Sequence, residues 1–385
     1  MENKAAVATR AAAPQAPQVA RRVAPPVAWR RALFLLPAGA ALAAGLDAAL
    51  LLLGLPAPVS LDRLADVHGM LLVFGFVGTL VSLERAVALR LRAGFAAPAF
   101  LGLGALALIS PAPLEIGQVL MVLGAMALTG VYVPLWRRQR DHAVLVQSLG
   151  AVLAVGALML WLGGAPVPVL LPWLVGFLVL TICGERLELA RVAMGPRAGT
   201  ILTWLSAALV SAVVATLLWP APGVPLLGLV LLVLVGWLSS HDVSRRTVRV
   251  AGQPRFMAVC MLAGYLWLGV AGAVWTVGGP AYDGARYDAV VHAVFLGFTI
   301  SMVLAHASVI LPAVLRRPLP HRSVFWAPVA LLHGSLLLRL WLGDGLGVEV
   351  GWRLGGLANI AALLLFVALA AWSTVAAPPG DKVAR

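Results

Sequence analysis

The chain has 385 residues, of which 62% are hydrophobic and only 11% are charged. Soluble domains carry about a quarter charged residues, so this composition excludes a disordered chain and an ordinary soluble enzyme. The net charge of +13 would suggest nucleic acid in a soluble protein, but here the basic residues lie between apolar segments, so we expect no nucleic-acid partner.

Twelve segments are long and apolar enough to cross a lipid bilayer, which takes about twenty helical residues. They are predicted over residues 31–54, 64–89, 95–110, 116–136, 143–162, 169–187, 201–218, 224–239, 256–277, 287–315, 324–342 and 350–372. Each is expected to be helical, because a backbone that faces lipid has no water to satisfy its polar groups. The sequence therefore predicts an all-α polytopic membrane protein, with the bilayer as its first partner and residues 29–375 as one transmembrane domain.

The two ends of the chain are polar. Residues 1–28 are rich in Ala, Pro and Arg and contain no apolar stretch, so they are predicted to form a disordered tail and not a cleaved signal peptide. Residues 376–385 form a short second tail.

The basic residues predict the orientation. With the N-terminus inside, all but four of the 28 Lys and Arg residues fall in the tails or in inner loops. Cytoplasmic loops carry such an excess, so both termini are predicted to be cytoplasmic. High use of Ala, Leu, Val, Gly and Arg is typical of a GC-rich bacterium, which makes the inner membrane the expected location. The four outer arginines are Arg63, Arg286, Arg339 and Arg353.

An internal repeat is suggested by a Gly-Phe pair in the second, sixth and tenth predicted helices. The pairs are Gly75-Phe76, Gly176-Phe177 and Gly297-Phe298. Because these helices are four apart, the chain is predicted to contain three units of four helices. The alternative is coincidence, since Gly-Phe pairs are common in apolar helices.

Ionisable side chains inside a membrane are costly and are candidates for function. His68 and His292 lie at similar depths near the outer ends of the second and tenth helices, and Asp47 lies in the same layer. Two facing imidazoles suit axial ligation of haem iron. Asp47 would then orient one ring through its second nitrogen, and the four outer arginines would bind the haem propionates. The alternative is that both histidines are ordinary interhelical hydrogen-bonding residues.

A second layer of ionisable residues is predicted farther from the outer surface. His306 and His333 fall at one depth on consecutive helices and are predicted to approach each other, where they would bind copper or a second haem. Glu84 and Glu185 lie nearer the inner surface as candidate proton-relay groups. The alternatives are structural roles for the histidines and interfacial ion pairs for the glutamates.

Two stretches resemble the NnrS family of haem- and copper-binding bacterial membrane proteins. They are His68-Gly69-Met70-Leu71 with Phe74-Gly75-Phe76, and residues 264–267 (GYLW) with His292-Ala293, Gly297, Met302, His306 and Leu338-Arg339. This resemblance implies a haem-binding protein linked to nitric-oxide or nitrosative-stress handling or to electron transfer, with copper as a second metal. More distantly, twelve helices in three groups of four resemble subunit I of the haem–copper oxidases, in which histidines on helices two and ten hold a haem.

The chain departs from the oxidase pattern. An oxidase needs three copper-binding histidines on helices six and seven, and residues 169–187 and 201–218 contain none. A terminal oxidase is therefore not expected. The sequence has no CxxCH motif, so the haem would be of the b type. A role in electron transfer would also require an electron-transfer partner. The main alternative is a twelve-helix secondary transporter in which Asp47, His68 and His292 line the path. A weaker one is a haem- or copper-handling assembly factor.

Overall fold

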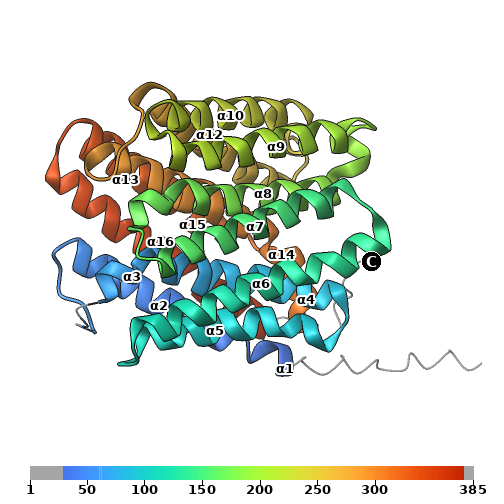
Figure 1. Cartoon of the computed structure of the whole chain (residues 1–385), viewed down its shortest axis with the longest axis horizontal. Coiled ribbons are helices and arrows are strands. Elements are labelled where there is room, and N and C mark those ends of the chain that lie inside the picture. The colour runs from blue at the N-terminus through green and yellow to red at the C-terminus, as the bar shows by residue number, and fades with distance from the viewer. Residues whose placement is uncertain (1–28, 60, 62, 377–385) are drawn as a thin grey trace, which may run out of the picture.

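The computed structural model describes residues 29–59, 61 and 63–376 (Figure 1). Both predicted tails, apart from Ala376, lie outside these residues. The described part of the chain is helical with no strand, and twelve of its helices are long and apolar enough to cross a membrane. The protein is therefore a polytopic all-α membrane protein, as predicted.

The first four membrane-crossing helices form the first unit. They are α1 (Trp29–Ala32) with α2 (Leu35–Leu52); α3 (Leu64–Met70), η1 (Leu71–Gly78) and α4 (Thr79–Leu89); η2 (Arg92–Phe95) with α5 (Ala96–Ile109); and α6 (Leu114–Gln139).

The next four helices form the second unit. They are α7 (His142–Leu162), α8 (Val167–Met194), α9 (Ala198–Leu218) and α10 (Pro220–His241).

The last four follow the short connecting helix α11 (Ser244–Thr247) and form the third unit. They are α12 (Gln253–Gly278); α13 (Gly284–His292), η3 (Ala293–Ile300) and α14 (Ser301–Leu315); η4 (Ser323–Phe325), α15 (Trp326–Leu337) and η5 (Leu338–Gly345); and α16 (Glu349–Val375).

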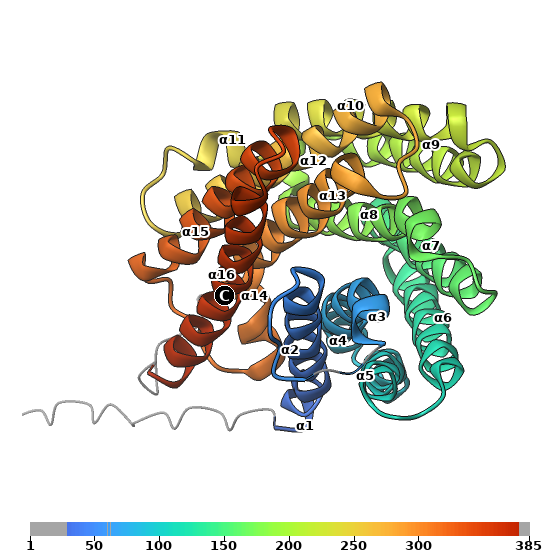
Figure 2. The same cartoon turned by 90° about the vertical axis from the view of Figure 1, so that its left-hand side faces the viewer.

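The second helix of each unit lies at the centre of the bundle. The rings of Phe74 and Phe177 stack with centroids 5.5 Å apart, which joins the second and sixth helices. The tenth helix packs on the second through α14 and α4, and on the sixth through η3 and α8. The three units follow one another around this centre, and α16 returns to contact α2 (Figure 2).

The repeated glycines lie at close helix contacts inside each unit. A Cβ atom at Gly75 would lie 2.8 Å from the Cβ of Ala41 and 2.9 Å from that of Ala105, on the helices before and after it. At Gly176 the nearest atom would be Leu153 Cδ1, 2.6 Å away on α7. The equivalent Gly297 packs against Trp267 on α12. In each case the added Cβ would meet a side chain of the first helix of the same unit. The shared position of the three glycines supports the predicted repeat.

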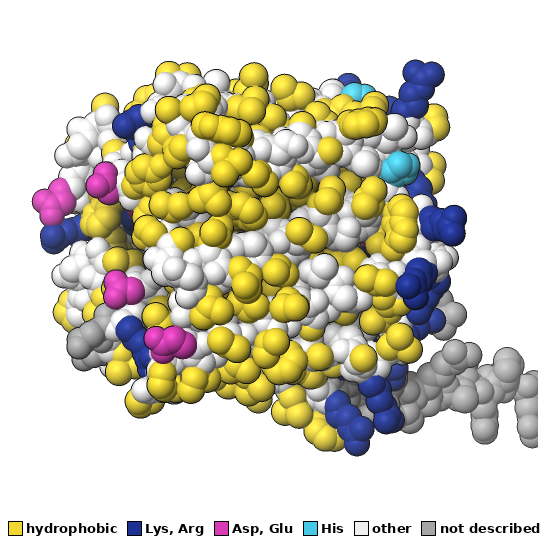
Figure 3. Space-filling model, viewed as in Figure 1, with side chains coloured by type: hydrophobic (Ala, Val, Ile, Leu, Met, Phe, Trp, Pro, Cys, Tyr) yellow, Lys and Arg dark blue, Asp and Glu magenta, His cyan; other side chains and the backbone are white. Residues whose placement is uncertain are grey.

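Charge is distributed unevenly between the two ends of the bundle. Most Arg side chains gather at the end where α4 and α14 finish, and several acidic side chains lie at the other end, near α3 and α13 (Figures 1 and 3). At the basic end, three helices terminate on arginines with left-handed backbone: Arg90, Arg140 and Arg316, with φ of 61°, 45° and 57°. Cations at helix C-termini face the negative end of the helix dipole.

Candidate cofactor site between two histidines

A cavity of about 380 Å³ lies among the central helices on the side of α3 and α13. Ligand and cofactor sites occupy roughly 300–1,000 Å³, so its size is suitable. Its walls are mainly Leu, Val and Phe side chains, and its polar lining includes His68, His292, Asp288 and Arg339. The structure thus brings the two outer histidines, which are far apart in sequence, into one apolar cavity.

His68 is held by the first helix. Its Nδ1 lies 2.8 Å from the carbonyl oxygen of Gly45, so Nδ1 carries the proton and donates. A Cβ at Gly45 would lie 2.5 Å from Leu72, so the glycine allows α2 to approach the second helix closely enough for this bond. The neutral ring keeps its lone pair on Nε2, which has no hydrogen-bond partner among the described residues.

His292 is held in the same way by its own helix. Its Nδ1 lies 2.9 Å from the carbonyl oxygen of Asp288 and 3.2 Å from the carboxylate oxygen Oδ1 of that residue. Here too Nδ1 donates, and Nε2 is left without a hydrogen-bond partner in the described part of the chain. A carboxylate behind a metal-binding histidine fixes its tautomer and raises its basicity.

Arg339 completes this group. Its Nε and Nη2 atoms each donate to Asp288 at 2.8 Å, and its guanidinium lies over the Trp352 ring, 4.8 Å from the centroid. Asp288 was not predicted from the sequence. Its spacing of four residues from His292 was a usable signal, because such residues share a helix face.

Three π-helical segments run along this cavity. η1 begins three residues after His68, η3 begins immediately after His292, and η5 contains Arg339. In η1 and η3 the repeated Gly-Phe pair takes the same position, the fifth and sixth residues. π-Helical turns inside α-helices occur frequently at functional sites. Their presence on three helices around one cavity supports a functional role for it.

Asp47 was predicted to orient one of the histidine rings, and in the structure other groups do this. Its carboxylate accepts from the backbone N–H of Val59 at 3.2 Å, and its other oxygen is buried without a partner among the described residues. Gly45, two residues earlier, orients His68 instead. The prediction named the correct helix, but the acceptor is a backbone carbonyl two residues before Asp47 and not its carboxylate.

Of the four outer arginines, only Arg339 lines the cavity. Arg63 donates to the carbonyl oxygen of Ala112 at 2.6 Å, and Arg286 donates to that of Gly278. Arg353 pairs with Glu349 at 2.7 Å on the exposed surface. The assignment of Arg63, Arg286 and Arg353 to the site is therefore corrected, while the role predicted for Arg339 stays a prediction. Carbonyls near helix ends lack intrahelical donors, and Arg63 and Arg286 donate to two of them.

The inner histidines do not form a pair. Nε2 of His306 accepts from Arg186 at 3.0 Å, while its Nδ1 lies 2.8 Å from the carbonyl oxygen of Met302. Nδ1 of His333 accepts from the indole N–H of Trp267 at 3.0 Å. In each ring one nitrogen already receives a hydrogen bond, and the donors differ, while Nε2 of His333 has no partner among the described residues. The predicted inner site of copper or a second haem has no support in these contacts.

Charged groups cluster at the ends of the central helices on the basic side of the bundle. Arg85 donates to Gln147 at 3.1 Å and to Glu188 at 2.9 Å, and it also pairs with Glu84. The predicted alternative for Glu84, an interfacial ion pair, is the arrangement observed.

Asp242, just beyond the end of α10, neutralises Arg186. Nε and Nη2 of Arg186 donate to its carboxylate at 2.9 and 3.0 Å, and the Tyr265 hydroxyl donates at 2.9 Å. Burial alone would raise the pKa of Asp242, but these donors hold the pKa below its ordinary value, so the carboxylate stays charged.

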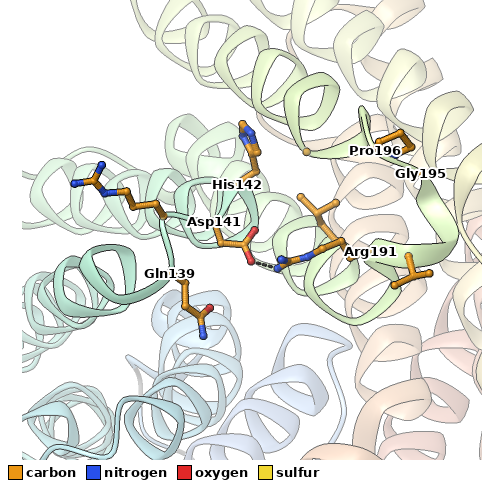
Figure 4. A pocket seen from close by; sticks show the side chains of 10 residues that line it. Gln139, Asp141, His142, Arg191, Gly195 and Pro196 are labelled. Carbon is orange, nitrogen blue, oxygen red and sulfur yellow. Dashed lines mark ion pairs between the residues drawn. The ribbon is translucent and has the colours of Figure 1, made fainter.

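A separate surface pocket at the basic end involves the loops before α7 and after α8 (Figure 4). Asp141 caps α7 by accepting from Ala143 N–H at 3.0 Å and pairs with Arg191. Nδ1 of His142 lies 2.9 Å from the Thr203 hydroxyl. These polar groups already have partners within the protein, and we assign them a structural role.

The comparisons with known proteins identify a family without an assigned activity. No curated protein matches the chain, and no solved structure matches it. The model of a family described as a domain of unknown function (DUF8744) matches residues 31–375, which include all but the first residues of the twelve-helix domain. The chain therefore belongs to the DUF8744 family.

Proposed function

We propose that this protein binds a b-type haem in the inner membrane of a bacterium, with His68 and His292 as the axial ligands. The observation that carries this proposal is the state of the two rings. Both line one apolar cavity, both have Nδ1 held by a carbonyl oxygen, and both leave Nε2 unengaged. Imidazole nitrogens prepared in this way are suitable ligands for haem iron.

The remaining polar groups have roles that follow from their contacts. The Gly45 carbonyl and Asp288 hold the tautomers of the two histidines. Arg339 is bonded to Asp288 through Nε and Nη2, so its Nη1 would be left to donate to a propionate. The apolar walls would limit the access of water to a bound haem. A bound haem would supply one-electron chemistry. If both histidines held the haem iron, no position would be left for nitric oxide, which favours electron transfer as the role of this protein.

The orientation belongs to the same proposal. The basic end of the bundle faces the cytoplasm together with both termini, so the cavity of His68 and His292 lies in the periplasmic half. The expected electron-transfer partner is then a periplasmic or membrane-soluble donor.

A secondary transporter is the second candidate, favoured by a different observation. The histidine cavity and a deeper cavity share the lining residues Phe76, Val77, Leu178 and Thr299. Together they extend along the centre of the bundle, as a substrate path would.

An absorption spectrum of the purified protein separates the two candidates. The haem proposal predicts a sharp reduced-state band in the wild type and its loss in His68→Ala and His292→Ala. His241→Ala serves as the control, because this histidine is exposed at the basic end and stacks on Trp237. A protein that remains colourless after expression with excess haem, or unchanged haem content in both variants, would exclude the haem and favour transport.

A further inference from the structure

The deeper cavity is a second candidate binding site, and nothing in the proposed haem function uses it. It has a volume of about 450 Å³ and lies among α2, α4, α8, α14 and α16. Most of its walls are Leu, Val, Ile, Ala and Phe side chains. A cavity of this size and character suits a lipid-soluble molecule.

The cavity reaches the lipid-facing surface between the first and last helices. Gly39 on α2 and Ala371 on α16 line the cavity and are exposed. Val367 and Val375 on α16 also line it and are 43% and 76% exposed. In Figure 2, α14 lies behind the space between α2 and α16. A molecule dissolved in the bilayer could therefore enter from the side without crossing water.

The inner part of the cavity carries carboxylates. Glu84 and Glu185 line it together with His306. Glu84 is paired with Arg85, but Glu185 has no hydrogen bond or ion pair with any residue between 63 and 376. Around this point four carboxylates (Glu84, Glu185, Glu188 and Asp242) accompany two guanidiniums (Arg85 and Arg186). This excess of negative charge disfavours fatty acids and anionic phospholipids.

One buried hydroxyl that lines the cavity also lacks a partner. Thr299 is 2% exposed, and its Oγ1 has no hydrogen-bond partner among the described residues. The Oγ1 of Thr181, by contrast, lies against Gly150 on α7, which does not line the cavity. An unpaired buried polar atom costs free energy, and a ligand that hydrogen-bonds to it recovers that cost. The site therefore favours a ligand with a neutral headgroup, which can donate and accept hydrogen bonds, and an apolar tail.

We propose that this cavity binds a quinol. The two ring hydroxyls of a quinol can donate to Glu185 and exchange a hydrogen bond with Thr299, and its isoprenoid chain fits the apolar mouth between α2 and α16. The headgroup would lie beside Phe76, Val77, Leu178 and Thr299, the residues that also line the histidine cavity. The proposal concerns binding and does not depend on the presence of haem.

Titration of the purified full chain with decylubiquinol tests this site, with binding followed by calorimetry in detergent. The wild type is expected to bind one molecule per chain. Glu185→Gln should weaken binding roughly tenfold, because a charge-assisted hydrogen bond becomes a neutral one. Gly39→Leu should abolish saturable binding, since a side chain there enters open space in the cavity mouth.

Gly130→Leu is the matched control. Gly130 is also exposed with nothing within 4 Å of an added Cβ, but it lies on α6 outside the cavity, so binding should be unchanged. Absence of saturable binding to the wild type, equal binding to Gly39→Leu, or equal displacement by oleate or by dodecylamine would overturn the proposal. Haem content measured on the same samples reports on the proposed function separately, so that either proposal can fail alone.

Discussion

At the scale of single residues, hydrogen bonds to ring nitrogens distinguish the outer histidines from the inner ones. In His68 and His292 a carbonyl oxygen takes the Nδ1 proton and leaves Nε2 available. In His306 and His333 a donor from another helix occupies the lone pair. Depth along a helix could be estimated from the sequence for all four residues. The partners that lie on other helices (Gly45, Arg186 and Trp267) could not be identified from it, because they depend on how the helices pack.

The ion pair between Asp288 and Arg339 is expected to be important for stability as well as for the site. The two oxygens of Asp288 accept from Arg339 at 2.8 Å, and the arginine side chain is only 8% exposed. Asp288→Ala leaves a buried guanidinium unpaired, so it should lower the free energy of unfolding by about 3 kcal/mol. Denaturant unfolding in detergent, followed by Trp fluorescence, measures the change.

The exposed pair of Glu349 and Arg353 provides the control for this measurement. Its side chains are 72% and 49% exposed, so Glu349→Ala should cost less than about 1 kcal/mol. Equal destabilisation by the two variants would contradict a special role for Asp288.

At the scale of whole helices, the repeated glycine sets the spacing between the first and second helices of a unit. A Cβ at Gly297 would lie 2.4 Å from Trp267 Cγ, so Gly297→Ala must displace the indole that donates to His333. Overpacking of this kind costs about 1–3 kcal/mol, and a lower melting temperature in detergent is expected.

Gly334→Ala should instead raise the melting temperature in detergent. Gly334 lies inside α15 with nothing within 4 Å of an added Cβ, and alanine is the better helix former by about 0.5–1 kcal/mol. If Gly297→Ala is as well tolerated as Gly334→Ala, then the close crossing at Gly297 is not required for the fold.

The helices themselves were largely predictable, and their local distortions were not. Twelve spans follow from the length of apolar segments that a bilayer requires, and the positions of Gly75, Gly176 and Gly297 predicted three units. The Gly-Phe pair does not predict a π-helical turn, because it lies in one in η1 and η3 but in regular helix in α8. Such turns depend on tertiary packing around the cavity.

At the scale of the whole molecule, topology predicted where the site lies but not which charges belong to it. The depths of His68 and His292 were sufficient to predict that they share a layer, and the structure places both in one cavity. Arg63, Arg286 and Arg353 were assigned to the site because they share its side of the membrane. Their partners are instead the nearest carbonyls or, for Arg353, a carboxylate one helical turn away. The side of the membrane is encoded by charge counts, whereas contacts of long side chains are decided within a few ångströms.

The orientation of the bundle is open to direct measurement. The basic side chains gather at one end, while the loop between α7 and α8, which contains Gly164, lies at the other. With the basic end in the cytoplasm, a reporter that works only in the periplasm should be silent when fused after Arg385 and active when fused after Gly164. A cytoplasmic fluorescent reporter should show the reverse pattern at the same two positions. Activity of the periplasmic reporter at Arg385 would show that the molecule has the opposite orientation, with the cavity of His68 and His292 in the cytoplasmic half of the membrane. The electron donor would then have to be sought on that side.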